Sequence, residues 1–535
     1  MKLSPSWGRW PRLGLLTFQL FVLASTCFPL VSCNWKYKSR PDLSPPTLNI
    51  TIPASAETAP GYIFIAPYSG VPWSEATAHG PLQPGPYIFT SSGELIWSGF
   101  GYVSGWAANF QVARWEGKEV LFAFEGTRNG HGHSHGHVKI LDERYETVKE
   151  VRGGNHELVD LHEFHVVDEK TALVESYHPL PYDLRPYGAN EESQWIVDAR
   201  FWELDIETGR VIFEWRSLDH VLPDESIQPI SSLKLGTGHN SSDAIDYFHI
   251  NSVDRDAQHN YLISGRQTST IYKINGTTGE IIWRLGGKNS NFKLGSGVEF
   301  SFQHHARYIS ADEDTEVISL FDNSGALLPK GKTGTISSGK LLLLNTKTWT
   351  VTLLQAFPTP PNSNIFAFSQ GNTQILPNGN AFTNWGSGGA ITEHSANGTV
   401  LFHAFLESGE LWKNGDVQNY RGFRYEWKGF PTEEIAVVAL KDGESRKGTA
   451  IYGERVLLGE EERKAFETEF LVRGGKEWER FVVEAVGGEG EVLRKSKVVK
   501  SAEYVYPFAP GGGDFVERIK DLAGQQVLVG DSEEL

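Results

Sequence analysis

One type of β-hairpin recurs six times along the chain and constrains the fold more than any other feature. Each copy has two apolar strands joined by a short polar turn, as in ELDIETGRVIFEW and KINGTTGEIIWRL. The turn centres lie at Gly93, Arg144, Gly209, Gly279, Trp349 and Gly398. Their spacings are about 51, 65, 70, 70 and 49 residues, at or somewhat above the length of a propeller blade. Six such hairpins predict six blades.

The segments between these hairpins are also strand-like. Patterns such as YIFIAP, VLFAFEG and YLISGR are short, rich in β-branched and aromatic residues, and bounded by turn residues, whereas long amphipathic helical patterns are scarce. We therefore predict an all-β fold with a six-bladed β-propeller over residues 60–430. An array of β-sandwiches is the alternative, but such domains do not usually repeat one hairpin at this period.

The composition changes on both sides of the predicted propeller. Residues 34–59 are rich in Pro and Ser and are predicted to form a linker or clasp. After RGFRYEWKGF the hairpin repeat stops, and short strand patterns over residues 431–505 indicate a small β-sandwich-like domain. Residues 506–535, which include APGGGDF and DSEEL, are predicted to be a flexible tail.

The first 33 residues have the pattern of a secretory signal peptide. Basic residues precede an apolar segment over residues 13–30, and VSC at 31–33 is a plausible cleavage site. A retained signal anchor is the alternative, although the run is interrupted by polar residues and short for a spanning helix. We expect a secreted protein without stable membrane insertion.

Cysteine and sequon content agree with secretion. The only cysteines, Cys27 and Cys33, lie in or beside the predicted signal, so the mature chain would rely on a large core rather than on disulfides. Four sequons are predicted glycosylation sites and fit a eukaryotic secretory route: Asn49, Asn240, Asn275 and Asn397. The net charge of -17, without a basic tract, argues against a nucleic-acid partner.

Polar residues of the inner strands are the candidates for a functional site. Each blade of a propeller places its innermost strand along the central channel, where side chains from different blades can converge. Aligned on the apolar strand that follows, five segments place polar side chains at or near one register: Gln111, His162, His249, His304 and Asn372. Three of these are histidines in a chain with only 17. They predict a channel site; the alternative is that they satisfy backbone groups of the inner strands.

The segment FQHHARY, residues 302–308, contains two adjacent histidines. Successive side chains of an extended strand point to opposite faces, so His304 and His305 cannot both serve one site. The register places His304 level with the other channel histidines. We expect His305 to point into the blade or toward its neighbour, with a packing or hydrogen-bonding role.

Several motifs together indicate a family. They are DLHEF (160–164), DYFHINSV (246–253), LISGRQTSTIYKINGTTGEIIWRLGG (262–287), FQHHAR (302–307) with LFDN (320–323), and GNTQILPNGNAFTNWG (371–386). In combination they make the sequence resemble the arylsulfotransferase family, and specifically its fungal secreted branch, over roughly residues 60–430. The resemblance implies a six-bladed propeller that transfers a sulfuryl group from an aryl sulfate to a phenol without a nucleotide donor, a cofactor or a metal.

The resemblance also implies roles for individual residues. The Q-H of FQHHAR places the histidine that becomes transiently sulfated at His304. Arg266 of S-G-R matches a sulfate-binding position. Sulfuryl transfer requires mainly that the reacting atoms be held in line and that charge on the equatorial oxygens be neutralised, which a guanidinium does well. Nearby positive charge keeps a histidine neutral and therefore nucleophilic.

The remaining implied positions concern acid–base chemistry and sulfate binding. His249 and Asn251 of H-I-N match such positions, and His162 of DLHEF is the third histidine, with His165 as its competitor. A plain phenol has a pKa near ~10, so the leaving phenolate needs a proton or a hydrogen-bond donor. His249 or His162 could supply it.

Alternatives remain for two of these features. Without the resemblance, Arg266 could instead pair with Asp254 or Asp256. The HGHSHGH run over residues 131–137 resembles a metal-binding cluster, but its glycines and expected loop position favour a flexible, solvent-exposed segment, because a metal site needs fixed geometry.

The function also has rivals. One is a propeller of the same family that binds or isomerises an aromatic or terpenoid metabolite without sulfotransfer. Another is a secreted wall- or carbohydrate-binding protein that uses the C-terminal domain. A quinoprotein-type oxidoreductase would need cation ligands and a cofactor plug that the sequence does not indicate.

Overall fold

A computed structural model describes residues 37–69, 83, 85–103, 106–325, 333–334, 336–363, 365–407, 417–441, 466–468, 480–486 and 490–503. The predicted signal peptide, both cysteines and the predicted tail lie outside the described residues. The chain divides into two compact units, 1–44 and 45–535, and the elements below belong to the second.

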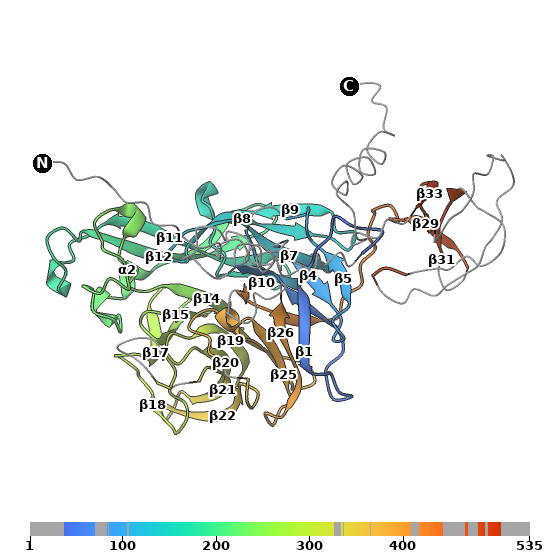
Figure 1. Ribbon diagram of the computed structural model, residues 1–535. Coiled ribbons are helices and arrows are strands. Elements are labelled where there is room, and N and C mark those ends of the chain that lie inside the picture. The colour runs from blue at the N-terminus through green and yellow to red at the C-terminus, as the bar shows by residue number, and fades with distance from the viewer. Residues whose placement is uncertain are drawn as a thin grey trace, which may run out of the picture. The chain divides into compact units, whose positions relative to one another are not determined.

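Six sheets of four or five strands, antiparallel except for one short outer strand of the fifth sheet, follow one another through the described part of that unit (Figure 1). In spatial order within each sheet, the strands are β28 (Phe423–Tyr425), β2 (Tyr62–Ile65), β4 (Tyr87–Phe89) and β5 (Leu95–Ser98); β6 (Trp106–Trp115), β7 (Lys118–Arg128), β8 (Ser134–Leu141) and β9 (Thr147–Val151); β10 (Phe164–Val167), β11 (Thr171–Pro181), β12 (Trp195–Asp205) and β13 (Val211–Arg216); β14 (Ile250–Arg255), β15 (Tyr261–Gly265), β16 (Thr270–Ile274) and β17 (Ile281–Gly286); β19 (His304–Ala311), β20 (Thr315–Asp322), β21 (Ser338–Asn345), β22 (Thr350–Pro358) and β18 (Lys293–Leu294); and β23 (Asn372–Ile375), β24 (Ala381–Asn384), β25 (Ala390–His394), β26 (Val400–Glu407) and β1 (Thr47–Ile52).

The sheets form a closed ring, which confirms the prediction of an all-β, six-bladed propeller. Each inner strand contacts the inner strand of the next sheet: β28 contacts β6, β6 contacts β10, β10 contacts β14, β14 contacts β19, and β19 contacts β23. Contacts between β24 and β28 close the ring. The first sheet takes its inner strand from the C-terminal side of the propeller, and the sixth takes its outer strand from the N-terminal side. Closure therefore joins distant parts of the chain.

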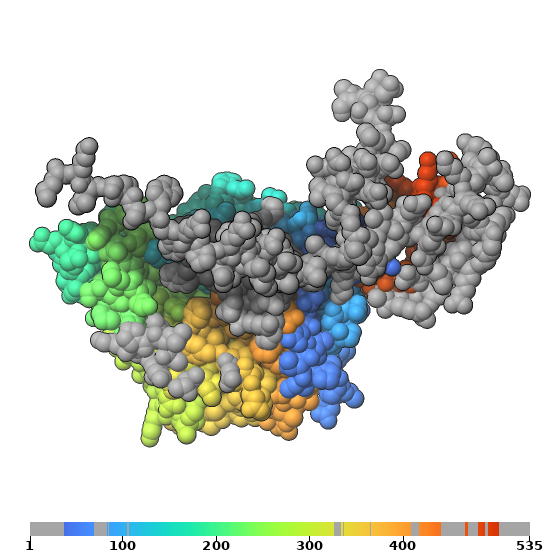
Figure 2. Space-filling view, viewed as in Figure 1, coloured from blue at the N-terminus to red at the C-terminus, as the bar shows by residue number. Residues whose placement is uncertain are grey.

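Within the predicted linker or clasp over residues 34–59 lies a strand, β1, so this part of the segment is not a linker. Thr47–Ile52 pair antiparallel with β26, from Thr47 opposite Glu407 to Ile52 opposite His403. In Figure 2 the blue surface of this N-terminal segment borders the orange surface of residues near 400. The physical reason is that TLNITI alternates apolar and polar side chains, as an edge strand with one buried face does.

The six recurrent hairpins are the outer hairpins of the six blades. Each predicted turn centre lies between the third and fourth strands of its sheet, as Gly209 does between β12 and β13. Gly209 and Gly279 have φ values of 71° and 78°, in the left-handed region where glycine is unstrained, so these turns favour glycine. Trp349 adopts a φ of 53° at the equivalent turn.

The hydrophobic core fills the spaces between neighbouring blades. Phe201 and Trp215 of the third sheet pack against Phe248 and Tyr261 of the fourth, with ring centroids 5.1 to 5.8 Å apart. Because both faces of a middle strand are covered, β16 is buried at every position. This packing fixes the inner strands relative to one another and hence the side chains that face the channel.

Other elements are short. A two-stranded sheet pairs β3 (Pro67–Ser69) with β27 (Val417–Asn419). Helical turns are α2 (Ser217–His220), η1 (Gly154–His156), η2 (Arg185–Tyr187), η3 (Pro223–Glu225), η4 (Ser241–Asp243) and η5 (Gly386–Gly388). No helix within the described ranges has the length and apolar character needed to cross a membrane.

The C-terminal region is described in part. Its strands are β29 (Ala439–Lys441), β30 (Arg480–Phe481), β31 (Glu484–Val486), β32 (Val492–Lys495) and β33 (Val499–Glu503). They form a three-stranded sheet in the order β29-β33-β30 and a β31-β32 hairpin. A sandwich-like domain over residues 431–505 stays a prediction, because much of it lies outside the described residues.

Candidate active site

The three predicted histidines converge from three consecutive blades. His162 lies two residues before β10, His249 lies one residue before β14, and His304 is the first residue of β19. The rings of His162 and His249 are 4.9 Å apart, and Tyr420 lies 5.1 Å from His162 and 6.4 Å from His304. All four side chains are buried. The inner-strand register thus brings the histidines to one place.

The other two residues of that register do not join the cluster. The Gln111 amide donates to Asn109 at 2.7 Å and accepts a hydrogen bond from the Tyr425 hydroxyl at 3.2 Å. Asn372 accepts from the Gly422 amide and donates to its carbonyl oxygen, both at 2.9 Å. Both side chains therefore satisfy backbone or side-chain groups between blades.

Local irregularities at the start of the inner strands aim the histidines. His249 has a φ of 54°, and the pairing of β14 with β15 shifts register between Ile250 and Val253. His305 has a φ of 55° within the irregularity that separates His304 from Arg307. Such bulges re-aim single side chains, often next to functional sites. His304 consequently faces the histidine cluster, whereas the His305 ring contacts Phe423 at 5.9 Å.

Hydrogen bonds determine which nitrogen of His304 carries the proton. The Asn323 amide donates to the carbonyl oxygens of Ala367 and Gln370, at 2.9 and 3.0 Å, which orients its Oδ1 toward His304. His304 Nδ1 therefore donates to that Oδ1, at 2.7 Å. Nε2 carries no proton and accepts a long hydrogen bond, 3.2 Å, from the backbone N–H of Gln370. The nitrogen facing the cluster is thus the nucleophilic one.

The electrostatic surroundings keep His304 neutral. Burial is the main cause that lowers its pKa well below the usual value, and the Arg266 guanidinium is the next. His162 and His249 lower it further, against the hydrogen bond to Asn323. A neutral imidazole whose Nε2 carries no proton is the form needed for nucleophilic attack.

Arg266 is a half-buried cation beside the histidines without a carboxylate partner in the described part of the chain. Its guanidinium lies 5.4 Å from the Phe302 ring and donates to the Phe368 carbonyl oxygen at 3.4 Å. The alternative partners are engaged elsewhere, since Asp254 binds His165 and Asp256 binds Lys273. These contacts leave the guanidinium available to an anion.

Two Asp–His pairs flank the cluster. His162 Nδ1 is hydrogen-bonded to Asp160 Oδ1, and Asp160 also accepts from the backbone of Ser134. His249 Nδ1 is hydrogen-bonded to Asp246 Oδ2 at 2.5 Å. In both pairs the carboxylate orients the imidazole through Nδ1 and leaves Nε2 for the cluster. Burial lowers the pKa of His162, and it lowers the pKa of His249 to about 4, in each case against the attraction of the paired aspartate.

A second carboxyl lies behind the first pair. Glu175 is fully buried, and neither of its side-chain oxygens has a hydrogen-bond partner among the described residues. Burial raises the pKa of Glu175 well above its ordinary value, and the charges of Asp160 and Glu163 add to the effect. Burial and the two neighbouring carboxylates thus favour the protonated form of Glu175.

Ligand-type side chains form two compact groups here: His133, Asp246 and His249, and Asp160, His162 and Glu175. Each group has the residue types and spacing that could surround a metal ion. In both, however, an imidazole nitrogen is hydrogen-bonded to the aspartate, which accounts for the arrangement. We therefore interpret them as hydrogen-bonded Asp–His groups.

The HGHSHGH segment is not the flexible, exposed loop that the sequence suggested. Residues 134–137 begin β8, and His133 is buried, with its Nε2 2.8 Å from Asp246 Oδ2. At Gly136 a Cβ would lie 2.1 Å from the Glu125 carbonyl oxygen, so only glycine fits on this buried face of the strand. The alternation of histidine and glycine over residues 135–137 therefore follows the two faces of β8. His131 and His135 remain exposed.

Asn251 belongs to a buried network below the cluster. Its side-chain amide donates to the Gln303 carbonyl oxygen, and its backbone carbonyl oxygen accepts from Arg421, both at 2.8 Å. Arg421 is 2.9 Å from Glu163, which also lies 2.7 Å from Arg307. The Asn251 side-chain amide therefore fixes the backbone of Gln303, the residue before His304. Sulfate binding by Asn251 stays a prediction.

Comparison with known proteins identifies the family. The arylsulfotransferase (ASST) family matches residues 111–407, more than half of the chain, and this range contains the three histidines and Arg266. The chain belongs to the arylsulfotransferase family. Membership supports an arylsulfotransferase-like function with small aromatic substrates. A search of curated proteins finds no match.

Similar solved structures are distant. A protein of unknown function from Bacteroides caccae shares 9% identity, covering 68% of this chain and 98% of that one, with a TM-score of 0.37. Hydrazine synthase from Kuenenia stuttgartiensis shares 10%, covering 58% and 70%, with a TM-score of 0.30. The Dos1 propeller shares 11%, covering 56% and 71%, with a TM-score of 0.26.

The family motifs located the three histidines but not the residues that orient them. Asp160, Asp246 and Asn323 lie inside the motifs DLHEF, DYFHINSV and LFDN, and were not singled out. Their positions two or three residues before a histidine were the available signal for the two aspartates. Asn323 and Tyr420 are distant in sequence from their partners, so no local pattern points to them.

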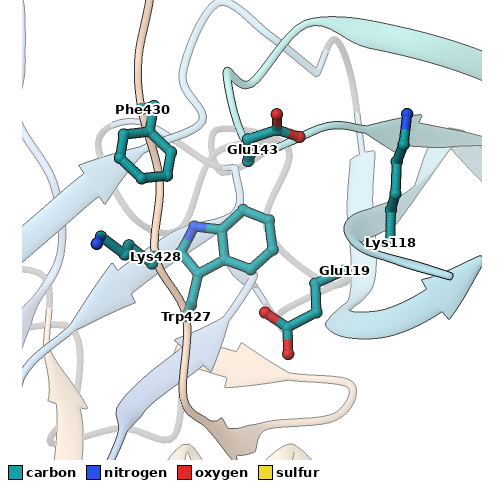
Figure 3. A pocket seen from close by; sticks show the side chains of 6 residues that line it. All are labelled: Lys118, Glu119, Glu143, Trp427, Lys428 and Phe430. Carbon is teal, nitrogen blue, oxygen red and sulfur yellow. The ribbon is translucent and has the colours of Figure 1, made fainter.

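A separate surface pocket lies away from these residues. It has a volume of about 360 Å³ and is lined by Lys118, Glu119, Glu143, Trp427, Lys428 and Phe430. Figure 3 shows the Trp427 indole at its centre, with charged side chains around it. Neither Arg266 nor any of the three clustered histidines, His162, His249 and His304, lines this pocket.

Proposed function

We propose that this arylsulfotransferase-family protein transfers a sulfuryl group from an aryl sulfate to a phenol through a sulfated His304, without a nucleotide donor. The observation that carries the proposal is the Arg266 guanidinium, which has no carboxylate partner among the described residues and lies beside three histidines from three blades. A sulfate monoester anion matches a fork of donors next to a neutral imidazole.

In the first half-reaction, His304 Nε2 attacks sulfur and the bond between sulfur and the aryl oxygen breaks. The Nδ1–H to Asn323 hydrogen bond stabilises the positive charge that the sulfated ring acquires. The bound sulfate anion favours the protonated form of His249 or His162, and the leaving phenolate takes its proton from that imidazolium. Arg266 neutralises charge on the sulfuryl oxygens.

The second half-reaction reverses these movements with another phenol. The acceptor oxygen attacks sulfur, its proton passes to the same imidazole, and the bond between His304 Nε2 and sulfur breaks. The enzyme returns to its starting protonation state, so protons and sulfuryl groups balance. The aromatic rings of Tyr177 and Tyr420, which lie 5.6 and 5.1 Å from His162, border the position of the reacting groups.

Steady-state kinetics test this proposal. With nitrophenyl sulfate as donor and a phenol as acceptor, in the absence of any nucleotide, a covalent intermediate requires parallel double-reciprocal lines and a sulfated acceptor as product. His304→Ala should abolish transfer, and His305→Ala is the matched control because His305 contacts Phe423 instead. Intersecting lines, or undiminished transfer by His304→Ala, would exclude this mechanism.

We also propose that the protein belongs to the fungal secreted branch and is glycosylated. Asn240 and Asn397 are exposed, and Asn275 and Asn49 are partly exposed, which supports access of the glycosylation machinery. N-terminal sequencing of secreted material would locate the cleavage, and a mobility shift after enzymatic removal of N-glycans would identify the sugars. Retention of residues 1–33 in the mature protein would favour the signal anchor.

A further inference from the structure

His133 is the polar residue of this region to which neither motif nor family assigns a role. It directly precedes β8 in the second blade, is buried, and lies with its ring 5.6 Å from that of His249. Its ring stacks on Tyr177 at 4.1 Å with an interplanar angle of 18°. This packing holds the imidazole in one orientation.

His133 and His249 share one carboxylate oxygen. His133 Nε2 lies 2.8 Å and His249 Nδ1 2.5 Å from Asp246 Oδ2. Asp246 Oδ1 is buried and accepts no hydrogen bond from any described residue. Since an ionised carboxylate only accepts, both nitrogens must carry hydrogens. The carboxylate is therefore contacted by two imidazoles through a single atom.

Sharing the carboxylate couples the two imidazoles. One negative charge stabilises one imidazolium well, and two like charges on the same oxygen disfavour each other. A positive charge on His133 therefore makes His249 harder to protonate, and a neutral His133 makes it easier.

We propose that His133 is a positioning residue that sets the basicity of His249 by sharing Asp246 with it. The inference rests on the proposed function, because it concerns the imidazole that exchanges a proton with the phenols. Without His133, Asp246 would stabilise the imidazolium of His249 alone, and His249 would return its proton less readily.

The charges around the two imidazole rings agree with the proposed coupling between His133 and His249. Burial lowers the pKa of His133, but Asp246 and Asp160 outweigh it and the repulsion of Arg128, so the pKa is raised. For His249, burial lowers the pKa to about 4, helped by His162 and Arg266 and opposed by Asp246. Tyr177 and, at 6.5 Å from His133, the His131 ring also face the pair, and His131 lies 3.1 Å from Asp243.

The test compares His133→Gln with His133→Phe. The Gln amide keeps an N–H donor for Asp246 but cannot take a charge, so His249 should become more basic. The acid limb of kcat/KM for the acceptor should then move upward by about one pH unit. His133→Phe also removes the donor, and transfer at the optimum pH should fall at least about tenfold. His131→Gln is the control, since exposed His131 pairs with Asp243 instead.

A second readout does not require turnover. Selectively ¹³C-labelled histidines in the full chain report the His249 titration by NMR, assigned with His249→Gln. An upward shift of that titration in His133→Gln supports the coupling. An unmoved titration and an unmoved acid limb, with only the melting temperature lowered, would show that His133 is structural and overturn the proposal.

Two further outcomes are separable. A stoichiometric metal ion that metal analysis detects in the wild type and not in His133→Gln would overturn the proposal, because Asp246 would then be a metal ligand. A wild type that transfers no sulfuryl group overturns the proposed function, whereas the NMR titration still decides whether His133 and His249 are coupled.

Discussion

Replacing Asn323 by alanine tests whether the proton position on His304 matters. Asn323 is fully buried and makes three hydrogen bonds, one from His304 Nδ1 and two to backbone carbonyl oxygens. Each is worth about 1 kcal/mol net. The Ala367 oxygen keeps a hydrogen bond from Ser337, whereas His304 Nδ1 loses its acceptor. We expect a loss of about 3 kcal/mol in the free energy of unfolding.

The effect on rate is separate from the effect on stability. When His304 becomes sulfated its ring is positively charged, so the bond to Asn323 changes from neutral to charge-assisted, a gain of about 1 to 1.5 kcal/mol. Loss of that gain slows sulfation of His304 about tenfold. The burst of phenol from an aryl sulfate, followed well below the melting temperature, measures this step.

A matched control separates the two effects. Ser337→Ala removes hydrogen bonds with the backbone of Ala367 but does not touch His304. It should lower stability without slowing sulfation. If Asn323→Ala were destabilised as expected and yet sulfated at the wild-type rate, the argument from the Nδ1–H hydrogen bond would be refuted.

Three further predictions concern other charged groups. Arg266→Lys keeps the positive charge but loses the planar set of N–H donors, so kcat/KM for the donor should fall about 10- to 100-fold in steady-state assays. An unchanged value would show that Arg266 does not bind the sulfate group. Burial lowers the pKa of His394 and of His403 to about 4, from 6.5 in the unfolded chain. Between pH 4 and pH 6.5 the unfolded chain therefore binds more protons than the folded chain, so the melting temperature should fall as the pH is lowered from 6.5 to 4. A variant with Gln at both positions should show a smaller fall, and an equal fall in that variant would contradict the account. Glu163→Gln leaves the buried Arg421 without its ionised partner, which costs about 3 to 5 kcal/mol. The melting temperature should fall by roughly 5 °C in a thermal scan, whereas a change within error would show that the ion pair is dispensable.

The blades could be predicted from the sequence because each is a local unit. The hairpins are built from residues adjacent in the chain, so strand patterns and turn glycines such as Gly209 and Gly279 report them directly. Ring closure could not be predicted in this way. Pairing of β1 with β26 joins segments more than 350 residues apart, and the alternation in residues 47–52 does not indicate which strand they pair with.

The candidate site shows the same limit. Register along repeated strands placed His162, His249 and His304 together, since equivalent positions of a repeat face one axis. The orienting residues depend on irregularities, because a φ of 54° at His249 departs from the regular strand that the alignment assumed. His133 was misjudged because its burial depends on contacts with Tyr177 and Asp246, which come from another blade and from a segment more than 100 residues away.

Peptide mapping after reaction with an aryl sulfate tests the central claim most directly. The protein would be incubated without an acceptor, quenched and digested, and the FQHHAR peptide examined by mass spectrometry. We expect one added sulfuryl group on His304, absent from His304→Ala and retained by His305→Ala. Release of phenol while that peptide stays unmodified, or a sulfuryl group on another residue, would contradict the account.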